Sequence, residues 1–530
     1  MKVGIQNPIL RGFNPDPSIL RVGEDYYIAT STFEWFPGVQ IHHSKDLVSW
    51  ELVARPLCTI EHLNMIGNLP SAGVWAPCLS YDNGLFYLIF SDVKAYAVEP
   101  FKDVYNYVTT ATQVGGEWSK PSYLNSSGFD PSLFHDEDGR KWLVNMEWDY
   151  RKQGIKKFTG ILLQEYDAEQ KKLVGESYKI FAGTSLGLTE APHLYKRNGY
   201  YYLVTAEGGT SYEHAVTVAR SRTLLGPYTV HPRNPILTAY GKETLIQKAG
   251  HASLVETPEG KWYIAYLGAR PIQGKCPLGR ETCLQELEWD KEDWPFLKGG
   301  GNSPRTTVEV EVKRNESLQL ATREQGTKHY LFNEESFWED FQSLRVPLNK
   351  EDIHIDREKG YLSLRGRESI YSRHYQSLLA RRQEDLTFEA EVVMQFEPSH
   401  FMQMAGLIYR YNEENLYYLY MSHDEHLKSR VLCLICVNQG TYTLLATKAI
   451  QADEVTLKVK VEKEKTHFYY KEKDQESYQL VADNLDTTIL SDEHAIPMCF
   501  TGAFVGLCVQ DLKEQKCWAT FKRFTYTGKE

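Results

Sequence analysis

The chain has 530 residues, of which 13% are aromatic, and its 34 tyrosines are the unusual part of the composition. This length exceeds what one hydrophobic core supports, so it predicts two domains, or one large repeat array with an addition. The formal net charge of −11 comes without basic runs, which argues against a nucleic-acid groove or an anionic membrane surface and favours a neutral or polar ligand.

The N-terminal stretch and the cysteines indicate a reducing compartment. The first eight residues lack the apolar core of a signal peptide, and no stretch reaches the roughly 20 apolar residues that span a bilayer. The nine cysteines are scattered, and the single CxxC, formed by Cys433 and Cys436, lies inside an apolar run. We therefore expect a cytoplasmic protein with mostly buried free thiols and without a zinc or redox site at that pair.

A short motif recurs five times in the first part of the chain. It begins with Asp16 in Asn14-Pro15-Asp16-Pro17-Ser18, and its equivalents begin at Ala76, Asp130, Ala191 and His251. The intervals are 60, 54, 61 and 60 residues, and each copy reads as a strand, a polar turn and an aromatic strand. About sixty residues hold four short strands, and four-stranded units repeated radially make a β-propeller, here with five blades. A linear solenoid is the alternative, but it predicts shorter repeats and capping units.

The repeat also predicts a site. The innermost strand of each propeller blade lies along the central channel, so equivalent residues at its start converge. At that position, or one residue before it, the five copies carry Asp16, Trp75, Asp130, Glu190 and His251. Three carboxylates in one small space are unfavourable for folding alone, because like charges repel and desolvation costs free energy. We therefore expect the channel to hold a functional site.

The rest of the chain predicts a second β domain. The sequence turns polar between Arg305 and His329, and segments such as 386–394 and 457–462 then alternate apolar and polar residues with period two, which is typical of a β-sandwich. The predicted fold is all-β. It comprises a five-bladed β-propeller over residues 1–310, a linker over 311–328, and a β-sandwich domain over 329–530 that helps to close the site.

Carboxylates beside aromatic residues, without a metal-ligand motif, suggest glycoside hydrolysis. In that chemistry one carboxylic acid protonates the leaving oxygen and one carboxylate acts on the opposite face of the sugar. A metal hydrolase is disfavoured because no HExxH occurs, and His423-Asp424-Glu425-His426 reads as the tip of a hairpin.

Four separated segments resemble the family 43 glycoside hydrolases, and most closely their two-domain β-xylosidases. They are, in order, Phe13-Asn14-Pro15-Asp16-Pro17-Ser18, Gly128-Phe129-Asp130-Pro131-Ser132, Thr189-Glu190-Ala191-Pro192-His193 and Pro277-Leu278-Gly279-Arg280-Glu281-Thr282. The resemblance implies that Asp16 is the general base, Glu190 the general acid, and Asp130 a third carboxylate that orients Glu190 and raises its pKa. It also implies inversion at the anomeric carbon, with the Asp16 and Glu190 carboxyl groups roughly 6.5–9.5 Å apart.

The resemblance implies substrate-binding residues as well. Arg280 would hold sugar hydroxyls, and Phe504 would reach across from the sandwich to close the pocket. His251 matches a channel histidine that in some relatives lies near calcium or water. No cofactor is required, and calcium near His251 is left open. The remaining implied residues are the aromatic walls Phe33, Trp75 and Trp148, and Thr210 in a loop beside the pocket.

The first hypothesis is an inverting, exo-acting β-1,4-xylosidase that releases xylose from the non-reducing end of xylo-oligosaccharides, with α-L-arabinofuranosidase side activity. The alternatives are an α-L-arabinofuranosidase as the main activity and, from another class, a non-catalytic sugar-binding propeller. We expect a homo-oligomer, either dimer or tetramer, with no nucleic-acid or membrane partner. Only Gln273-Gly274-Lys275 separates Ile272 from Cys276, where close relatives carry a longer loop, so the oligomer and the preference beyond two subsites stay open.

Overall fold

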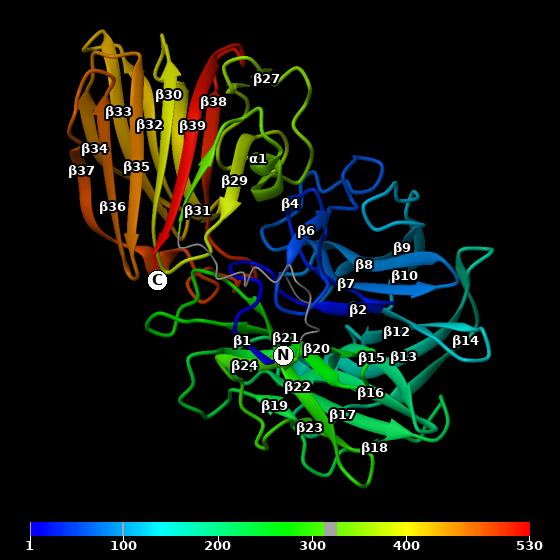
Figure 1. The fold of residues 1–530 in the computed structure, drawn as a ribbon. Helices are drawn as coiled ribbons and strands as arrows, with labels where there is room; N and C mark the ends of the chain where they lie inside the picture. The colour runs from blue at the N-terminus through cyan, green and yellow to red at the C-terminus, as the bar shows by residue number, and fades with distance from the viewer. Residues whose placement is uncertain (1, 98–99, 312–325, 530) are drawn as a thin grey trace.

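The structure is a computed structural model that describes residues 2–97, 100–311 and 326–529. The first part forms five antiparallel sheets arranged around a common axis (Figure 1). The first blade consists of β2 (Ser18–Val22), β3 (Asp25–Thr30), β5 (Gln40–Ser44) and β6 (Glu51–Ala54). The second consists of β7 (Gly73–Asp82), β8 (Leu85–Ala95), β9 (Asp103–Ala111) and β10 (Ser122–Asn125). The five-bladed propeller predicted from the repeat is therefore confirmed.

The other three blades follow the same plan. The third blade consists of β11 (Ser132–His135), β12 (Lys141–Trp148), β13 (Phe158–Asp167) and β14 (Lys172–Phe181). The fourth consists of β15 (Glu190–Arg197), β16 (Tyr200–Glu207), β17 (Ala215–Ser221) and β18 (Thr229–Val230), with β19 (Leu237–Thr238) also paired to β17. The fifth consists of β20 (Gln247–Glu256), β21 (Trp262–Ala269), β22 (Glu281–Trp289) and β23 (Pro295–Leu297).

Turn chemistry explains several of the hairpins. Asn83 and Gly84, between β7 and β8, have φ angles of 49° and 80°, and Asn198 and Gly199, between β15 and β16, have 49° and 72°. A two-residue type I′ hairpin turn needs two consecutive residues with positive φ, which Asn-Gly adopts at little cost. Outside the blades, the first strand β1 (Lys2–Gln6) pairs with β24 (Thr307–Glu311). The two ends of the propeller sequence therefore meet in one small sheet.

The second domain is a sandwich of two sheets. One sheet has the order β34-β33-β32-β31-β38-β29-β26-β4, and the other β27-β28-β39-β30-β35-β36-β37, with β25 paired to β39. Strand β30 buries every second residue, as period-two alternation predicts. The core between the sheets includes Phe388, Leu407, Leu457 and Phe521. The predicted β-sandwich is confirmed.

The strands of the sandwich have the following bounds: β25 (Thr327–Tyr330), β26 (Phe341–Leu344), β27 (Ile353–Asp356), β28 (Tyr361–Arg365), β29 (Ser377–Arg382), β30 (Thr387–Phe396), β31 (Gln403–Asn412), β32 (Asn415–Asp424), β33 (Ser429–Asn438), β34 (Thr441–Ala449), β35 (Glu454–Glu462), β36 (Lys465–Glu472), β37 (Gln479–Asp486), β38 (Phe504–Asp511) and β39 (Trp518–Lys529). The described helices are short: α1 (Glu335–Asp340) and the 3₁₀ turns η1 (Gly154–Lys157) and η2 (Thr487–Ile489). None of the helices in the described ranges is long and apolar enough to cross a membrane.

The two domains share a sheet. Strand β4 (Trp35–Phe36), which lies between β3 and β5 in the sequence, pairs with β26 of the sandwich, with Trp35 opposite Leu344 and Phe36 opposite Ser343. Figure 1 shows the sandwich, coloured from yellow to red, standing beside the first blade. The predicted linker, residues 311–328, falls mostly on 312–325, outside the described residues, so the predicted domain boundaries stay predictions.

Candidate active site

One backbone conformation recurs in all five blades, just before the innermost strand or within its first five residues. Asp16, Ala76, Asp130, Ala191 and His251 have φ angles of 57°, 37°, 53°, 50° and 42°. Left-handed backbone is uncommon and strained for residues other than glycine, and it concentrates at functional sites. In the second, fourth and fifth blades the strand register also shifts at this point. This turn aims the side chains of the repeated position into the channel.

Asp16 lies among partners that favour its ionised form. Its Oδ1 accepts a hydrogen bond from Arg280 Nη1 at 2.9 Å, and its Oδ2 accepts one from Ser31 Oγ at 2.5 Å. Nδ1 of His251 lies 3.5 Å from Oδ1. Burial alone would raise the pKa of Asp16, but the Arg280 charge, His251 and the Ser31 hydroxyl hold it below the ordinary value of 3.8. Asp16 is therefore a carboxylate at neutral pH.

Asp130 and Glu190 have the opposite tendency. Both are buried, and the backbone N–H of Ala191 donates to Asp130 Oδ2 at 3.2 Å. Burial and the charge of Asp16 raise the pKa of Asp130 to about 8. Burial and the charges of Asp130 and Asp16 raise the pKa of Glu190 well above 4.5. Two neighbouring buried carboxylates cannot both ionise easily, so this pair retains a proton at neutral pH.

Aromatic rings line the same space. The ring centroid of Phe33 lies 5.9 Å from that of Trp75 and 6.4 Å from that of Phe500, and the Arg280 guanidinium lies 5.5 Å from the Phe33 ring. Trp75 Nε1 donates to Ser71 O at 2.8 Å, which fixes the plane of its half-buried ring. Such ring faces, with a polar group at the rim, suit the C–H face and hydroxyls of a sugar.

The sandwich contributes Phe500 to this wall, where Phe504 was predicted. Phe504 is 0% exposed, opens strand β38, and stacks on Trp35 with centroids 3.6 Å apart, so its ring belongs to the interface core and does not face the pocket. Phe500 lies before that strand and is only half buried. Its N–H donates to Ser71 Oγ at 2.9 Å and its carbonyl accepts from Arg280 Nη2 at 3.1 Å. The family resemblance implied Phe504, whereas the sandwich residue that lies beside Arg280 and Phe33 is Phe500, four residues earlier.

Trp148 lies on another side of the site, with a lysine that the sequence analysis did not single out. Lys102 Nζ is 4.5 Å from the Trp148 ring centroid and donates to Tyr96 O at 3.1 Å. Burial lowers the pKa of Lys102 to about 8, although the nearby Glu190 charge raises it. No motif marks Lys102, because it lies in an irregular loop between β8 and β9. The Trp148 ring also contacts Phe129, with centroids 6.5 Å apart.

Thr210 contacts the arginine of the site. Its Oγ1 accepts from Arg280 Nη1 at 3.1 Å, so Arg280 bridges Asp16, Thr210 and the Phe500 carbonyl. The loop that carries Thr210 begins after buried Glu207. The Glu207 carboxylate accepts hydrogen bonds from Thr189 Oγ1 at 2.7 Å and from the Thr184 backbone N–H at 2.7 Å. Arg280 therefore offsets part of the negative charge, as predicted from the sequence.

The surroundings of His251 fit calcium poorly. Calcium prefers six to eight oxygen ligands, whereas the carboxylate nearest His251 is Asp16, already paired with the Arg280 cation. Burial lowers the pKa of His251 to about 4, so its imidazole is neutral. Among the described residues, no group of three or more His, Cys, Asp or Glu side chains is arranged to hold a metal ion.

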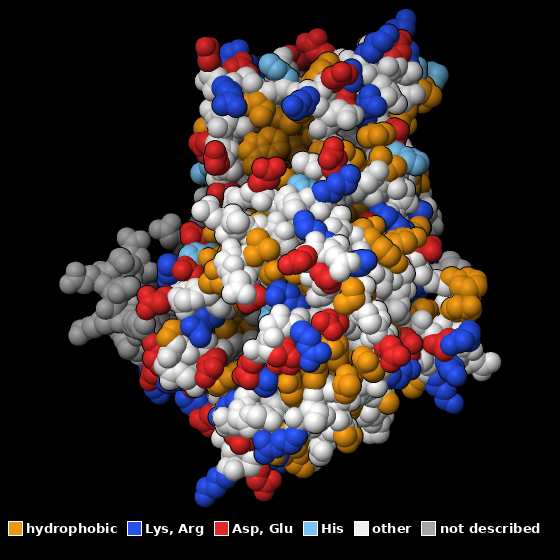
Figure 2. Space-filling view, turned by 90° about the vertical axis from the view of Figure 1, so that its right-hand side faces the viewer, with side chains coloured by type: hydrophobic (Ala, Val, Ile, Leu, Met, Phe, Trp, Pro, Cys, Tyr) orange, Lys and Arg blue, Asp and Glu red, His pale blue; other side chains and the backbone are white. Residues whose placement is uncertain are grey.

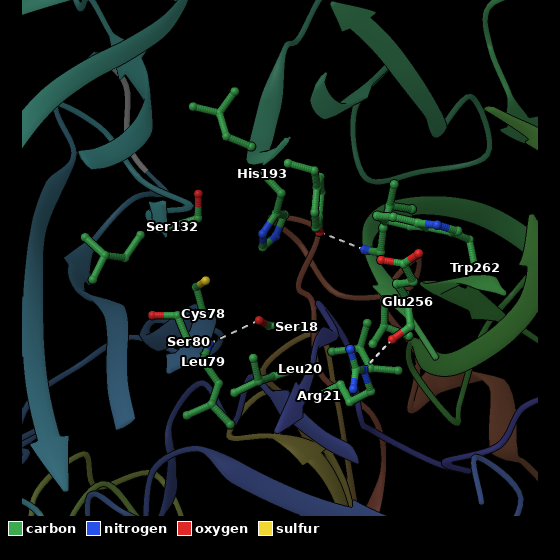
Figure 3. Close-up of a pocket in the computed structure, with 16 residues that line it drawn as sticks. Ser18, Leu20, Arg21, Cys78, Leu79, Ser80, Ser132, His193, Glu256 and Trp262 are labelled. Atoms are coloured by element: carbon green, nitrogen blue, oxygen red, sulfur yellow. Dashed lines mark hydrogen bonds between the residues drawn. The ribbon is translucent and has the colours of Figure 1, made fainter. Parts of the chain in front are cut away.

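A cavity of about 250 Å³ occupies the other end of the channel (Figure 3). Its walls come from residues further along the same innermost strands, among them Ser18, Cys78, Ser132, His193 and Tyr195. Figure 3 shows His193 pointing into this space, and burial lowers the pKa of His193 to about 3. The cavity therefore offers the neutral His193 together with the charged side chains of Arg21 and Glu256, while the paired carboxylates lie at the opposite end.

Comparisons with known proteins agree with this geometry. Residues 5–295 match the family described as "Glycosyl hydrolases family 43", and residues 329–527 match "Beta xylosidase C-terminal Concanavalin A-like domain". The chain is 46% identical to a "Beta-xylosidase" of Bacillus subtilis (strain 168), over 99% of this chain and 100% of the relative. It is 47% identical to "Xylosidase/arabinosidase 43B" of Humicola insolens, over 98% and 97%.

A solved structure shares the whole fold. The crystal structure of xylan beta-1,4-xylosidase from Bacillus Halodurans C-125 superposes with a TM-score of 0.95, at 48% identity, over 99% of this chain and 100% of that chain. The fold, the carboxylates of the channel and the matched sequence thus lead to one conclusion. The chain belongs to glycosyl hydrolase family 43 and is a glycoside hydrolase.

Proposed function

We propose that this enzyme is an inverting, exo-acting β-1,4-xylosidase that releases xylose from the non-reducing end of xylo-oligosaccharides, with α-L-arabinofuranosidase side activity. The observation that carries the proposal is that the two carboxyl groups of the channel, Asp16 and Glu190, have different protonation states. Arg280 and Ser31 keep Asp16 ionised, while burial and Asp130 keep Glu190 protonated. The names of the Bacillus subtilis and Bacillus halodurans relatives support the xyloside.

The mechanism follows from these two protonation states. Glu190 donates its proton to the glycosidic oxygen as the bond from that oxygen to the anomeric carbon breaks. Asp16 accepts a proton from a water molecule whose oxygen bonds to the anomeric carbon from the opposite face. The anomeric configuration of the product is then inverted, and after the reaction Asp16 is protonated while Glu190 is ionised. Asp16 then releases a proton to solvent and Glu190 takes one up, which restores the starting protonation states. The predicted separation of roughly 6.5–9.5 Å leaves room for that water.

The exo action is supported by a wall that the sandwich contributes to one side of the site. Phe500 and its loop, from the sandwich, cover the side where Arg280 and Phe33 lie. A wall at that place accommodates a terminal sugar and excludes a chain that continues past it. The arabinoside activity is supported by the Humicola insolens relative and by a Bacteroides ovatus relative, 34% identical, named "Non-reducing end alpha-L-arabinofuranosidase BoGH43B". The cytoplasmic location and the homo-oligomer stay predictions.

Paired substrates test the proposal. We expect kcat/KM to be higher on 4-nitrophenyl β-D-xylopyranoside than on the α-L-arabinofuranoside, and proton NMR to detect α-xylose as the first anomer released from xylobiose. Glu190→Gln should lower kcat on xylobiose by roughly 10²–10⁴-fold, but much less on the nitrophenyl xyloside, whose leaving group needs little protonation. Asp16→Asn should lose both activities. A preference for the arabinoside, or β-xylose as the first product, would contradict the proposal.

A further inference from the structure

Two exposed aromatic side chains contact each other at the rim of the propeller. Phe101 is 64% exposed and Tyr150 is 50% exposed, and their ring centroids are 5.1 Å apart. Single exposed aromatics are ordinary, but an exposed pair in contact leaves two ring faces available to a ligand. Phe101 lies in the loop between β8 and β9, and Tyr150 in the loop between β12 and β13.

Topology places both loops at the end of the channel that holds the carboxylates. Trp75 and Asp130 stand at the site ends of β7 and of β11, and β8 and β12 run antiparallel to those strands. The chain therefore leaves β8 and β12 at the site end. A hydrogen bond from Trp148 Nε1 to Pro100 O, at 3.2 Å, joins the end of β12 to the loop that carries Phe101.

The position of the general acid Glu190 indicates on which side of the bound sugar these two loops lie. Glu190, as general acid, must lie beside the oxygen of the leaving group. Lys102 is near enough to Glu190 for the charge of an ionised Glu190 to raise the pKa of Lys102. Lys102 Nζ lies 4.5 Å from the centroid of the Trp148 ring. Trp148 and Lys102 are thus on the leaving-group side, and Phe500 borders this side through the ring of Tyr96, 5.9 Å away between centroids. Phe101 precedes Lys102 in the chain, and Tyr150 follows Trp148 by two residues, so the pair extends the leaving-group side outward.

We propose that Phe101 and Tyr150 form a binding platform for the part of a β-linked xylo-oligosaccharide that lies beyond the first leaving-group sugar. The occupant is the reducing-end portion of a substrate of three or more xylose units, which stacks a C–H face on the rings. The platform is continuous with the active site through Trp148. This inference rests on the proposed function, because the direction of the chain is set by Glu190 acting as the acid.

The test is the dependence of kcat/KM on chain length. For the wild-type enzyme we expect kcat/KM to rise by roughly five- to tenfold from xylobiose to xylotriose. Phe101→Ala and Tyr150→Ala should each remove most of that rise while leaving xylobiose and 4-nitrophenyl β-D-xylopyranoside hydrolysis unchanged. Phe101→Trp should keep it. The matched control is Tyr442→Ala, which removes a 55% exposed tyrosine from strand β34 of the sandwich.

The outcomes separate this inference from the proposed function. A wild-type enzyme that shows no rise beyond xylobiose, or alanine variants that retain the rise, would overturn the platform while the xylosidase proposal stands. An equal loss on xylobiose and xylotriose would also overturn it, because the rings would then act on the pocket itself. Wild-type enzyme that leaves xylobiose intact would overturn the proposed function and this inference with it.

Discussion

At the scale of single residues, the site is built from one left-handed backbone conformation that recurs once in each of the five blades. The left-handed residue occurs in each blade, but the side chains aimed by it differ, and Asp16, Asp130 and His251 occupy it directly. In the other two blades it is an alanine, and the residue before it, Trp75 or Glu190, serves the site. A repeated fold can thus carry different chemistry at one repeated position.

The pH profile of Asp130→Asn tests how the acid is tuned. Burial is the largest cause of the raised pKa of Glu190, and the negative charge of Asp130 adds to it. Removing that charge should lower the pKa of Glu190, so the alkaline limb of kcat/KM on xylobiose should move to lower pH by about one unit. The acid limb reports Asp16 and should stay. Asp138→Asn, an exposed carboxylate of the same blade, is the control, and an unmoved alkaline limb would refute this tuning role.

The sequence predicted the repeated site residues because their signal is periodic. Asp16, Asp130, Glu190, Trp75 and His251 could be found by aligning the copies within the chain. Lys102 and Phe500 lie in irregular loops, which have no repeat and no hydrophobic period. Their positions depend on tertiary contacts, such as the one between the Phe500 carbonyl and Arg280, that no local pattern encodes.

At the scale of elements, the segment between η2 and β38 attaches the sandwich to the active site. Buried Lys248, in the fifth blade, forms ion pairs with Asp492, at 3.6 Å, and with Glu493. Tyr411 donates to Asp492 at 2.6 Å and accepts from the Thr501 backbone at 3.2 Å. The short loop noted in the sequence also reaches this segment, because Lys275 Nζ lies 3.2 Å from His494 Nδ1. These contacts hold Phe500 from both ends.

Phe500→Ala tests whether this segment is part of the sugar pocket. The backbone bonds of residue 500 to Ser71 and Arg280 survive the substitution, so the segment should stay in place while the ring face is lost. We expect KM for 4-nitrophenyl β-D-xylopyranoside to rise about tenfold, which corresponds to about 1.4 kcal/mol, with a smaller change in kcat. Phe401→Ala, at an exposed site of the sandwich, is the control. An unchanged KM would remove Phe500 from the pocket.

At the scale of the whole molecule, strand periodicity predicted each domain but not how the two are joined. The two-residue strand β4 is too short to show a period, yet it extends a sheet of the other domain. The interface also buries charge, which hydrophobic patterns do not reveal. Glu34 follows Phe33 in the first blade, and from the sandwich it meets Arg345, Glu413 and Arg410. Charged side chains of both signs are interspersed on the face in Figure 2, so surface charge does not mark the interface there either.

Glu34 makes the stability of the interface between the two domains depend on pH. Its Oε2 accepts from the Ser71 backbone at 3.0 Å. Burial raises the pKa of Glu34 to about 7, with Arg345 opposing and Glu413 adding to the rise. Despite its burial, the pKa of Glu413 is lowered to about 2 by the charges of Arg345 and Arg410, so Glu413 holds the two arginines above pH 5. Since Glu34 titrates near 4.5 when unfolded, its stabilising contribution is complete below pH 4.5 and is lost as pH rises towards 7.

Glu34→Gln should remove this loss, because glutamine keeps the acceptor for the Ser71 N–H but cannot ionise. The advantage of the variant over wild type in unfolding free energy should therefore grow between pH 5 and pH 8, by on the order of 3 kcal/mol. Thermal unfolding followed by circular dichroism at pH 5, 6, 7 and 8 measures it as a widening difference in midpoint. Glu61→Gln, at an exposed site of the same domain, should run parallel to wild type. If Glu34→Gln runs parallel as well, Glu34 is ionised throughout, and the interface holds a carboxylate where we infer a carboxylic acid.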